Sequence, residues 1–175
     1  MTEDLDHIVL GGGCFWCLEA VYKRIEGVVT TRPGYAGGYL ENPDYKTVCA
    51  GDTGHAEVVE IGFRPSMLSL NAVLDIFWMA HDPTTPDRQG NDVGPQYRSI
   101  ILYANQTQKT IAEASMAALE RSNTYSVPPV TQIVPLETFW PAEAYHKDYF
   151  EGNRTQGYCR LVIAPKLRKL NLMKD

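Results

Sequence analysis

A cysteine stands where a glycine-rich bend meets the expected start of a helix. The bend is Gly11–Gly13, the cysteine is Cys14, and Phe15, Trp16 and Cys17 follow it. Glycines let a backbone turn sharply, and the free N–H groups of a helix start favour the thiolate form of a cysteine. A short apolar run before the bend predicts a strand. We therefore expect Cys14 to be a nucleophile, with Phe15 and Trp16 walling an apolar pocket beside its sulfur.

Two long polar loops supply groups that could act on a molecule held beside this sulfur. Residues 37–54 form the first loop and residues 82–96 the second, and both are rich in glycine and polar residues. Long loops in compact domains are usually functional, and sites are commonly built where loops meet strands. An attacking thiol also needs an acid or hydrogen-bond donors where charge develops. The candidates at these junctions are Tyr45, Glu57, Asp92 and Tyr97.

Each candidate also has a purely structural interpretation. The two tyrosines could be amphipathic core residues, and Asp92 could hold a turn through its own side chain. Glu57 could be an exposed residue of a strand. His55, two residues before Glu57, is expected to hydrogen-bond its own loop. The clustering of the candidates at loop–strand junctions favours a functional site over these separate explanations.

The cysteine pair is compatible with several kinds of site. A metal half-site is disfavoured because no second Cys-x-x-Cys exists, and Cys49 and Cys159 stand alone. A thioredoxin-like disulfide oxidoreductase would use Cys14 and Cys17 as its exchanging pair, after a strand and before a helix. Alternatively, Cys14 attacks an electrophile and a second cysteine resolves the product. A non-enzymatic alternative is an aromatic cage for an ammonium ligand, with Glu57 as counter-ion.

Length and composition describe a single ordinary globular domain. The chain has 175 residues, a hydrophobic share of 44% and a charged share of 21%. The net charge of −5 makes a nucleic-acid-binding surface unexpected. No apolar run reaches the roughly 18 residues that span a membrane, and the acidic first residues resemble no targeting segment. Four cysteines in such a chain favour a redox or catalytic role in the cytoplasm over a disulfide framework.

Hydrophobic periodicity predicts helices alternating with strands. The Pro33 position suggests that the second strand lies at a sheet edge, and residues 166–169 are expected to be a solvated tail. This order predicts an α+β fold, with helices packed on a mixed sheet. The expected strands are residues 8–10, 28–35, 56–64, 98–103 and 132–136, and the expected helices follow Cys14 as far as Gly27 and cover residues 70–77, 107–121 and 142–150.

Six sequence blocks occur together in one order and reach from Val9 to Cys159. They are Gly13-Cys14-Phe15-Trp16-Cys17, Tyr35-Ala-Gly-Gly38, Asn42-Pro43-x-Tyr45, Gly54-His55-Ala56-Glu57, the Arg88–Arg98 segment, and Tyr145-His146-x-Asp148-Tyr149. The ordered set resembles the peptide methionine sulfoxide reductase A family. The resemblance implies a ferredoxin-like two-layer α+β fold with a mainly antiparallel sheet. It also implies reduction of the S epimer of methionine sulfoxide, free or in oxidised proteins. Thioredoxin is the implied electron donor, and we expect a monomer without cofactor or metal.

The resemblance assigns roles to the residues around the sulfur. Cys14 is implied to be the nucleophile that attacks the sulfoxide. Glu57 is implied to protonate the sulfoxide oxygen, because the sulfur is a poor electrophile until that oxygen is protonated or strongly hydrogen-bonded. Tyr45 and Tyr97 would donate their hydroxyls to the same oxygen. Asp92 would organise the polar part of the pocket.

The remaining implied roles concern the methyl group and recycling. Phe15 and Trp16 would form an apolar cup for the ε-methyl of the substrate. The product would be a sulfenic acid on Cys14, which a second thiol converts to a disulfide. Cys159 lies in a glycine-bearing segment, residues 151–175, that we expect to be mobile enough to reach Cys14. Cys17 is less favoured because bridging one helical turn demands strain.

Overall fold

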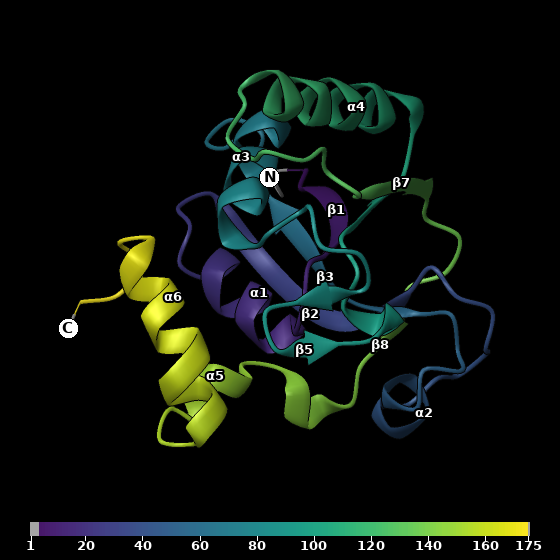
Figure 1. Ribbon diagram of the computed structural model, residues 1–175, viewed down its shortest axis with the longest axis vertical. Helices are drawn as coiled ribbons and strands as arrows, with labels where there is room; N and C mark the ends of the chain where they lie inside the picture. Colours follow the sequence, from purple (N-terminus) through teal and green to yellow (C-terminus); the bar gives the residue numbers. More distant parts are fainter. Residues whose placement is uncertain (1–3, 175) are drawn as a thin grey trace.

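The computed structural model describes residues 4–174 and shows a six-stranded sheet with helices packed on it (Figure 1). The strand order is β7-β6-β1-β3-β2-β8, and all neighbours are antiparallel except the parallel pair β6 and β7. The expected α+β class with a mixed, mainly antiparallel sheet is confirmed. The strands are β1 (Asp6–Gly11), β2 (Val28–Ala36), β3 (Ala56–Phe63), β6 (Ile100–Tyr103), β7 (Gln132–Pro135) and β8 (Trp140–Pro141).

Some of the helices begin after a residue whose side chain accepts a hydrogen bond from a free backbone N–H group. Ser69 accepts a hydrogen bond from the N–H of Ala72, and Asn105 accepts one from Gln108. The helices are α1 (Phe15–Tyr22), α2 (Tyr45–Cys49), α3 (Leu70–Ala80), α4 (Gln106–Arg121), α5 (Tyr149–Gly152) and α6 (Ala164–Lys169), with 3-10 turns η1 (Pro95–Tyr97) and η2 (Ala144–His146) and a π-helical stretch η3 (Cys159–Ile163). The second polar loop holds a two-stranded ribbon, β4 (Arg88–Gln89) and β5 (Asp92–Val93).

The apolar core on one face of the sheet is larger than the apolar core on the other face. Val59, Ile61 and Phe63 of β3 share one face, as their alternation predicts, and pack in the main core with the apolar sides of α1, α3 and α6. Ala56 and Val58 point to the other face, where a smaller cluster is covered by the chain after β7. The helices therefore bury one face of the sheet, and the loops at one end of β1 and β3 lie beside that buried face.

Pro33 is tolerated because β2 has almost no partner on one side. β2 pairs with β3 along its length, whereas β8 pairs only with Gly34 and Tyr35. The Pro33 carbonyl accepts a hydrogen bond from Ala142 at 3.0 Å, and its nitrogen faces the same side, where no ladder bond is needed. The expected edge position of this strand is wrong, because the two-residue β8 forms the edge beyond it.

The last third of the chain departs most from the expectations. The predicted helix over 142–150 is wrong, because Asp148 adopts the left-handed conformation (φ 53°) and separates η2 from the single turn α5. The predicted helix after Cys14 ends early, at Tyr22. The predicted solvated tail is helix α6, whose Leu167 is fully buried in the main core.

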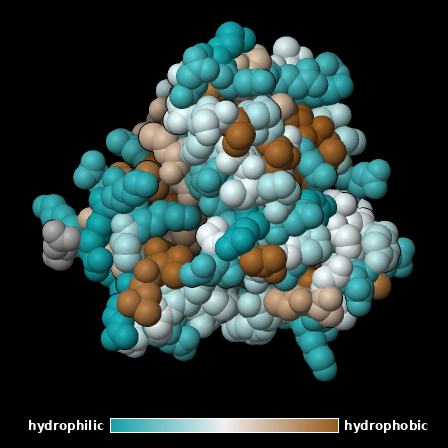
Figure 2. All heavy atoms as spheres, viewed as in Figure 1, coloured by the Kyte–Doolittle hydropathy of each residue, from teal (hydrophilic) through white to brown (hydrophobic). Residues whose placement is uncertain are grey.

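The surface carries no large apolar region on the face in view. Figure 2 shows hydrophobic residues there in small separate groups among hydrophilic ones. Within residues 4–174, no helix combines the length and the apolar character needed to cross a membrane.

Candidate active site

Cys14 lies where β1 gives way to α1, as the strand, bend and helix pattern predicts. It is the N-cap residue of α1, with an extended backbone, and only 8% of it is exposed. Gly13 before it has φ +90°, and a Cβ there would lie 2.8 Å from the side chain of Gln89. Its N–H donates to the carbonyl of Tyr97 at 3.2 Å. The bend therefore requires glycine, and it fixes the sulfur between the helix and the second polar loop.

Glu57 is buried at the start of β3, beside the N-terminus of α1. Its side-chain Oε1 accepts a hydrogen bond from the N–H of Phe15 at 3.1 Å. Its Oε2 is also buried and has no hydrogen-bond partner among the described residues. Burial raises the pKa of Glu57 to about 8, the Phe15 N–H opposes this, and the charge of Asp92 adds to it. The carboxyl is therefore mostly protonated at neutral pH, and the interpretation as an exposed strand residue is wrong.

Cys14 is a thiol, not a thiolate, in this state of the protein. Burial raises its pKa well above the usual value, and Glu57, whenever it is ionised, raises it further. The N–H of Trp16 lowers the pKa, which is the expected effect of the helix start, but it is outweighed. The expectation of a thiolate favoured by the helix fails here because burial disfavours the charged form.

The two tyrosine hydroxyls lie near the same carboxyl. Burial, followed by the charge of Glu57, raises the pKa values of both Tyr45 and Tyr97. Tyr45 opens helix α2, and its ring stacks on that of Phe15 with centroids 6.3 Å apart. Its N–H donates to Oε2 of Glu143 at 3.1 Å. Both hydroxyls keep their protons at neutral pH and can donate hydrogen bonds, and that of Tyr45 hydrogen-bonds the side chain of Cys49.

Asp92 connects the second polar loop to the C-terminal segment. It lies in β5, and its Oδ2 accepts a hydrogen bond from the hydroxyl of Tyr158 at 2.6 Å. Burial and then the charge of Cys14 raise the pKa of Tyr158, and its ring meets that of Trp16 edge-on with centroids 6.0 Å apart. The sequence singles out Cys159 as a recycling thiol but not Tyr158, whose contact with Asp92 spans 66 residues of the chain.

Phe15 and Trp16, the residues predicted to wall the apolar pocket, follow Cys14 at the start of α1 and pack against other aromatic rings. Phe15 is fully buried, while Trp16 is partly exposed and stacks on Tyr149 with ring centroids 3.7 Å apart. The indole N–H of Trp16 donates to Nδ1 of His146 at 2.8 Å. The sequence block that contains His146 and Tyr149 is visible without the structure, but their contact with Trp16 is not.

Cys17 lies close to two other cysteines. Burial raises the pKa of Cys17, and the ammonium group of Lys166 in α6 opposes this. A charge on Cys17 adds, after burial, to the raised pKa values of both Cys14 and Cys159. Cys159 is fully buried at the first residue of η3, so the expected mobile segment is an ordered one here. All four cysteines are free, and Cys49 is exposed at the end of α2.

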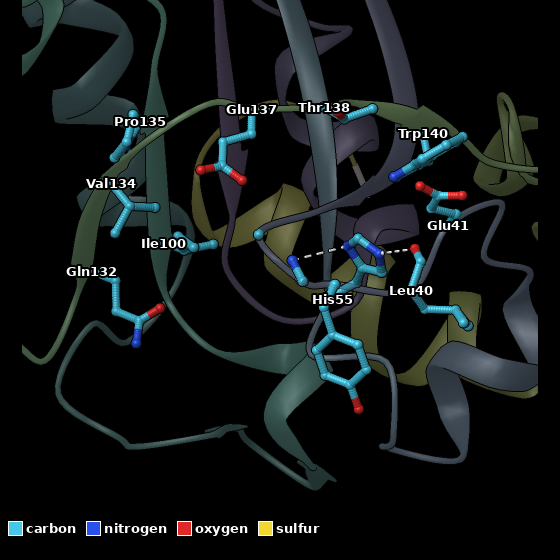
Figure 3. Close-up of a pocket in the computed structure, with 13 residues that line it drawn as sticks. Leu40, Glu41, His55, Ile100, Gln132, Val134, Pro135, Glu137, Thr138 and Trp140 are labelled. Carbon is cyan, nitrogen blue, oxygen red and sulfur yellow. Dashed lines mark hydrogen bonds between the residues drawn. The ribbon is translucent and has the colours of Figure 1, made fainter.

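A separate hollow lies over the other face of the sheet (Figure 3). It has a volume of about 470 Å³, and none of the proposed catalytic residues lines it. His55 lies in it and hydrogen-bonds its own loop as predicted, accepting from the Gly38 N–H at 3.0 Å and contacting the Leu40 carbonyl at 2.7 Å. In the described part of the chain, no group of three or more His, Cys, Asp or Glu residues could hold a metal ion.

Comparisons with known proteins agree on one family. The family model "Peptide methionine sulfoxide reductase" matches residues 6–175. The chain is 55% identical over 160 residues to peptide methionine sulfoxide reductase MsrA of Sulfolobus acidocaldarius, covering 91% of this chain and 90% of that one. It is similar in structure to reduced Mxr1 from Saccharomyces cerevisiae, with a TM-score of 0.83, 31% identity and 89% of each chain covered. Mxr1 in complex with Trx2 shares the fold, with a TM-score of 0.59, 22% identity and coverage of 85% and 89%.

Proposed function

This chain belongs to the peptide methionine sulfoxide reductase family, and we propose that Cys14 is the nucleophile of its reaction. The protein is an oxidoreductase that reduces methionine sulfoxide with a thiol. In the proposed step the oxygen passes from the substrate sulfur to the sulfur of Cys14. The products are methionine and a sulfenic acid on Cys14, so one sulfur is reduced by two electrons and the other is oxidised by two.

Glu57 is the proton donor to the sulfoxide oxygen. A single observation carries this proposal: Oε2 of Glu57 is buried without a partner while Oε1 is held by the Phe15 N–H, and the pKa is about 8. A protonated carboxyl with a free oxygen is equipped to give a proton to an incoming oxygen acceptor. The carboxylate left behind can take the proton of the Cys14 thiol, so protons balance over the step.

The rest of the pocket orients the three substituents of the substrate sulfur. The hydroxyls of Tyr45 and Tyr97 donate to the oxygen beside Glu57, and Asp92 holds the polar wall in place. Phe15 and Trp16 receive the ε-methyl, which a polar wall would not accommodate. Because the oxygen, the methyl and the attacking thiol then have fixed places around one chiral sulfur, only one epimer fits. We assign the S epimer, in free methionine sulfoxide or in oxidised proteins.

Recycling uses Cys159, and thioredoxin is the electron donor. The sulfenic acid on Cys14 condenses with the Cys159 thiol, releasing water, and a dithiol donor then opens the disulfide. The similarity to Mxr1, which has been seen in complex with Trx2, supports a donor of this class. Since Cys159 is buried, the proposed route requires the turn at η3 to open. Cys17, which lies close to both sulfurs, is the alternative resolving thiol.

The protein works as a monomer in the cytoplasm under this proposal. Its recycling depends on thiols that must return to the reduced form after each turnover, and a reducing compartment favours that state. All four cysteines are free in the structure, which is compatible with such a compartment.

The proton-donor role is tested by Glu57→Gln, which keeps a hydrogen-bonding group but has no acidic proton. We expect the single-turnover rate at saturating substrate to fall by about 10²-fold or more. The wild-type rate should decline as the pH rises through about 8, because Glu57 then loses the proton that it must donate. The variant should lack that decline.

Glu60→Gln is the matched control, since Glu60 lies on the same strand and pairs with Arg32 at 2.9 Å, away from the sulfur. It should retain the wild-type rate and pH profile. A Glu57→Gln protein as fast as wild type at saturating substrate would exclude the proposal.

The two alternatives from the sequence make different predictions. A carboxyl with a pKa of about 8 is neutral at pH 7, so Glu57 is a poor counter-ion for a caged ammonium group. Calorimetry with a quaternary ammonium ligand should therefore detect no binding. A thioredoxin-like disulfide oxidoreductase would exchange disulfides without consuming sulfoxide, and we expect wild-type protein to consume it.

A further inference from the structure

The indole of Trp16 is held on three sides. Its N–H donates to Nδ1 of His146 at 2.8 Å, one ring face stacks on Tyr149 at 3.7 Å and 9°, and Tyr158 meets it edge-on at 6.0 Å. The contacts with Tyr149 and Tyr158 are between aromatic rings, and they allow the indole to slide within its own ring plane. The hydrogen bond is directional, so it alone fixes the rotation of the indole about its own axis.

His146 can accept this bond only in one tautomer. Nδ1 must be unprotonated to accept the indole N–H, so the ring proton resides on Nε2. The side chain is fully buried, and burial lowers its pKa, which keeps the ring neutral. Nε2 has no partner among the described residues, so the contact with Trp16 is the one hydrogen bond that the ring makes there.

The backbone that carries His146 is anchored at both ends. Before it, Glu143 accepts hydrogen bonds from the hydroxyl of Tyr35 at 2.9 Å and the N–H of Tyr45 at 3.1 Å. After it, the N–H of Asp148 donates to the buried carboxylate of Glu19 at 2.7 Å. The segment that carries the imidazole is thus held on one side through Glu143 and on the other through the Glu19 carboxylate.

We propose that His146 is a positioning residue that sets the orientation of Trp16 in the substrate cup. The proposal rests on the proposed function, in which Trp16 receives the ε-methyl of the substrate. A wall that contacts the methyl does so before and during oxygen transfer alike, so its loss weakens binding without slowing the chemical step. His146 therefore acts on KM, whereas Glu57 acts on kcat.

A double-mutant cycle between the two side chains tests this assignment. His146→Leu should raise KM by about 10-fold with kcat changed less than about twofold, because the indole N–H loses its acceptor. His146→Asn places an oxygen where Nδ1 was, and it should restore KM to within about threefold of wild type. In a Trp16→Phe background, which has no indole N–H, His146→Leu should add less than about twofold.

Tyr145→Phe is the control from the same turn, because it loses only a 3.3 Å contact with Glu143. It should leave KM within about twofold of wild type. Urea unfolding of each variant separates loss of fold from loss of position. If His146→Leu does not fold, His146→Phe replaces it, since it keeps a ring without an acceptor. The proposal would be overturned if His146→Asn raised KM as much as His146→Leu does. It would also be overturned if His146→Leu raised KM by the same factor in the wild-type and Trp16→Phe backgrounds.

A measurement without turnover distinguishes this proposal from the proposed function. The chain has three tryptophans, so fluorotryptophan labelling gives three fluorine resonances, and Trp16→Phe identifies one of them. His146→Leu should shift and broaden that resonance alone, and His146→Asn should restore it. An unchanged resonance in His146→Leu would refute the positioning role even in an active enzyme. A shifted resonance in a protein that reduces no sulfoxide would refute the proposed function instead.

Discussion

The sheet end that carries Cys14 and Glu57 and the segment that carries Cys159 are built differently. Cys14 and Glu57 lie at the ends of long, paired strands, and a glycine bend and the N-terminus of α1 fix their distance. Cys159 lies in a run of short helical turns at the first residue of a π-helical stretch. Its segment touches the site through the hydrogen bond between Tyr158 and Asp92.

This difference matches two different demands. Oxygen transfer needs groups held in place before the substrate arrives, which paired strands provide. Forming a disulfide needs a thiol that can move several ångströms, and local turns open at lower free energy than a sheet. Under the proposed recycling route, opening the turn would also break the hydrogen bond between Tyr158 and Asp92.

The largest effect is expected from a variant without the Cys14 sulfur. This sulfur belongs to the sheet end that carries Cys14 and Glu57, the rigid region. Cys14→Ser should reduce methionine formation in a single turnover by on the order of 10³-fold or more, because covalent catalysis is lost. Quenched-flow measurement of methionine checks this. A variant that keeps more than about a tenth of the wild-type single-turnover rate would show that another group attacks the sulfoxide.

The next largest effect is expected from loss of Cys159, which should stop recycling and leave oxygen transfer in the rigid region intact. Cys159→Ser should release one methionine per enzyme at the wild-type rate and then stall, with thioredoxin-driven turnover reduced by about 10²-fold or more. The matched variant Cys49→Ser removes an exposed thiol but keeps a hydrogen-bonding group for Tyr45, so it should turn over normally.

Peptide mapping after one donor-free turnover identifies the disulfide partner. We expect a dominant link between Cys14 and Cys159. A dominant link between Cys14 and Cys17, with Cys159 still free, would move recycling into the rigid region and remove the need for the η3 turn to open.

The smallest effect is expected from removing a single tyrosine hydroxyl in the rigid region. Tyr45→Phe and Tyr97→Phe should each slow the single-turnover rate by about 3- to 10-fold, because the remaining hydroxyl and Glu57 still serve the oxygen. The double variant should lose more than the product of the two single losses, as expected for groups that share one oxygen. Strictly multiplicative losses would indicate that the hydroxyls act at different atoms.

The sequence predicts the rigid region well because its signals are local. Alternating apolar residues assign β3, and glycines followed by a cysteine assign the bend at Cys14. Glu57 is found because it lies at a loop–strand junction, although its pKa depends on burial that no local pattern reveals. The same limitation explains why a thiolate is expected at Cys14 and a thiol is found.

The recycling region is predicted poorly because its structure depends on distant contacts. The left-handed Asp148, which breaks the expected helix, has its N–H bound by Glu19, 129 residues away. Leu167 is buried by tertiary packing although basic residues surround it in the sequence. The acceptor role of His146 likewise depends on Trp16, which lies 130 residues earlier.

The raised pKa of Cys14 also bears on how the protein survives the conditions that create its substrate. Methionine sulfoxide accumulates when peroxides are abundant, and peroxides attack thiolates much faster than thiols. A buried sulfur that keeps its proton at rest is a poor target for such oxidants. Under the proposed mechanism, Cys14 reacts with molecules that meet Glu57, and its resting thiol form would protect it from oxidation outside that reaction.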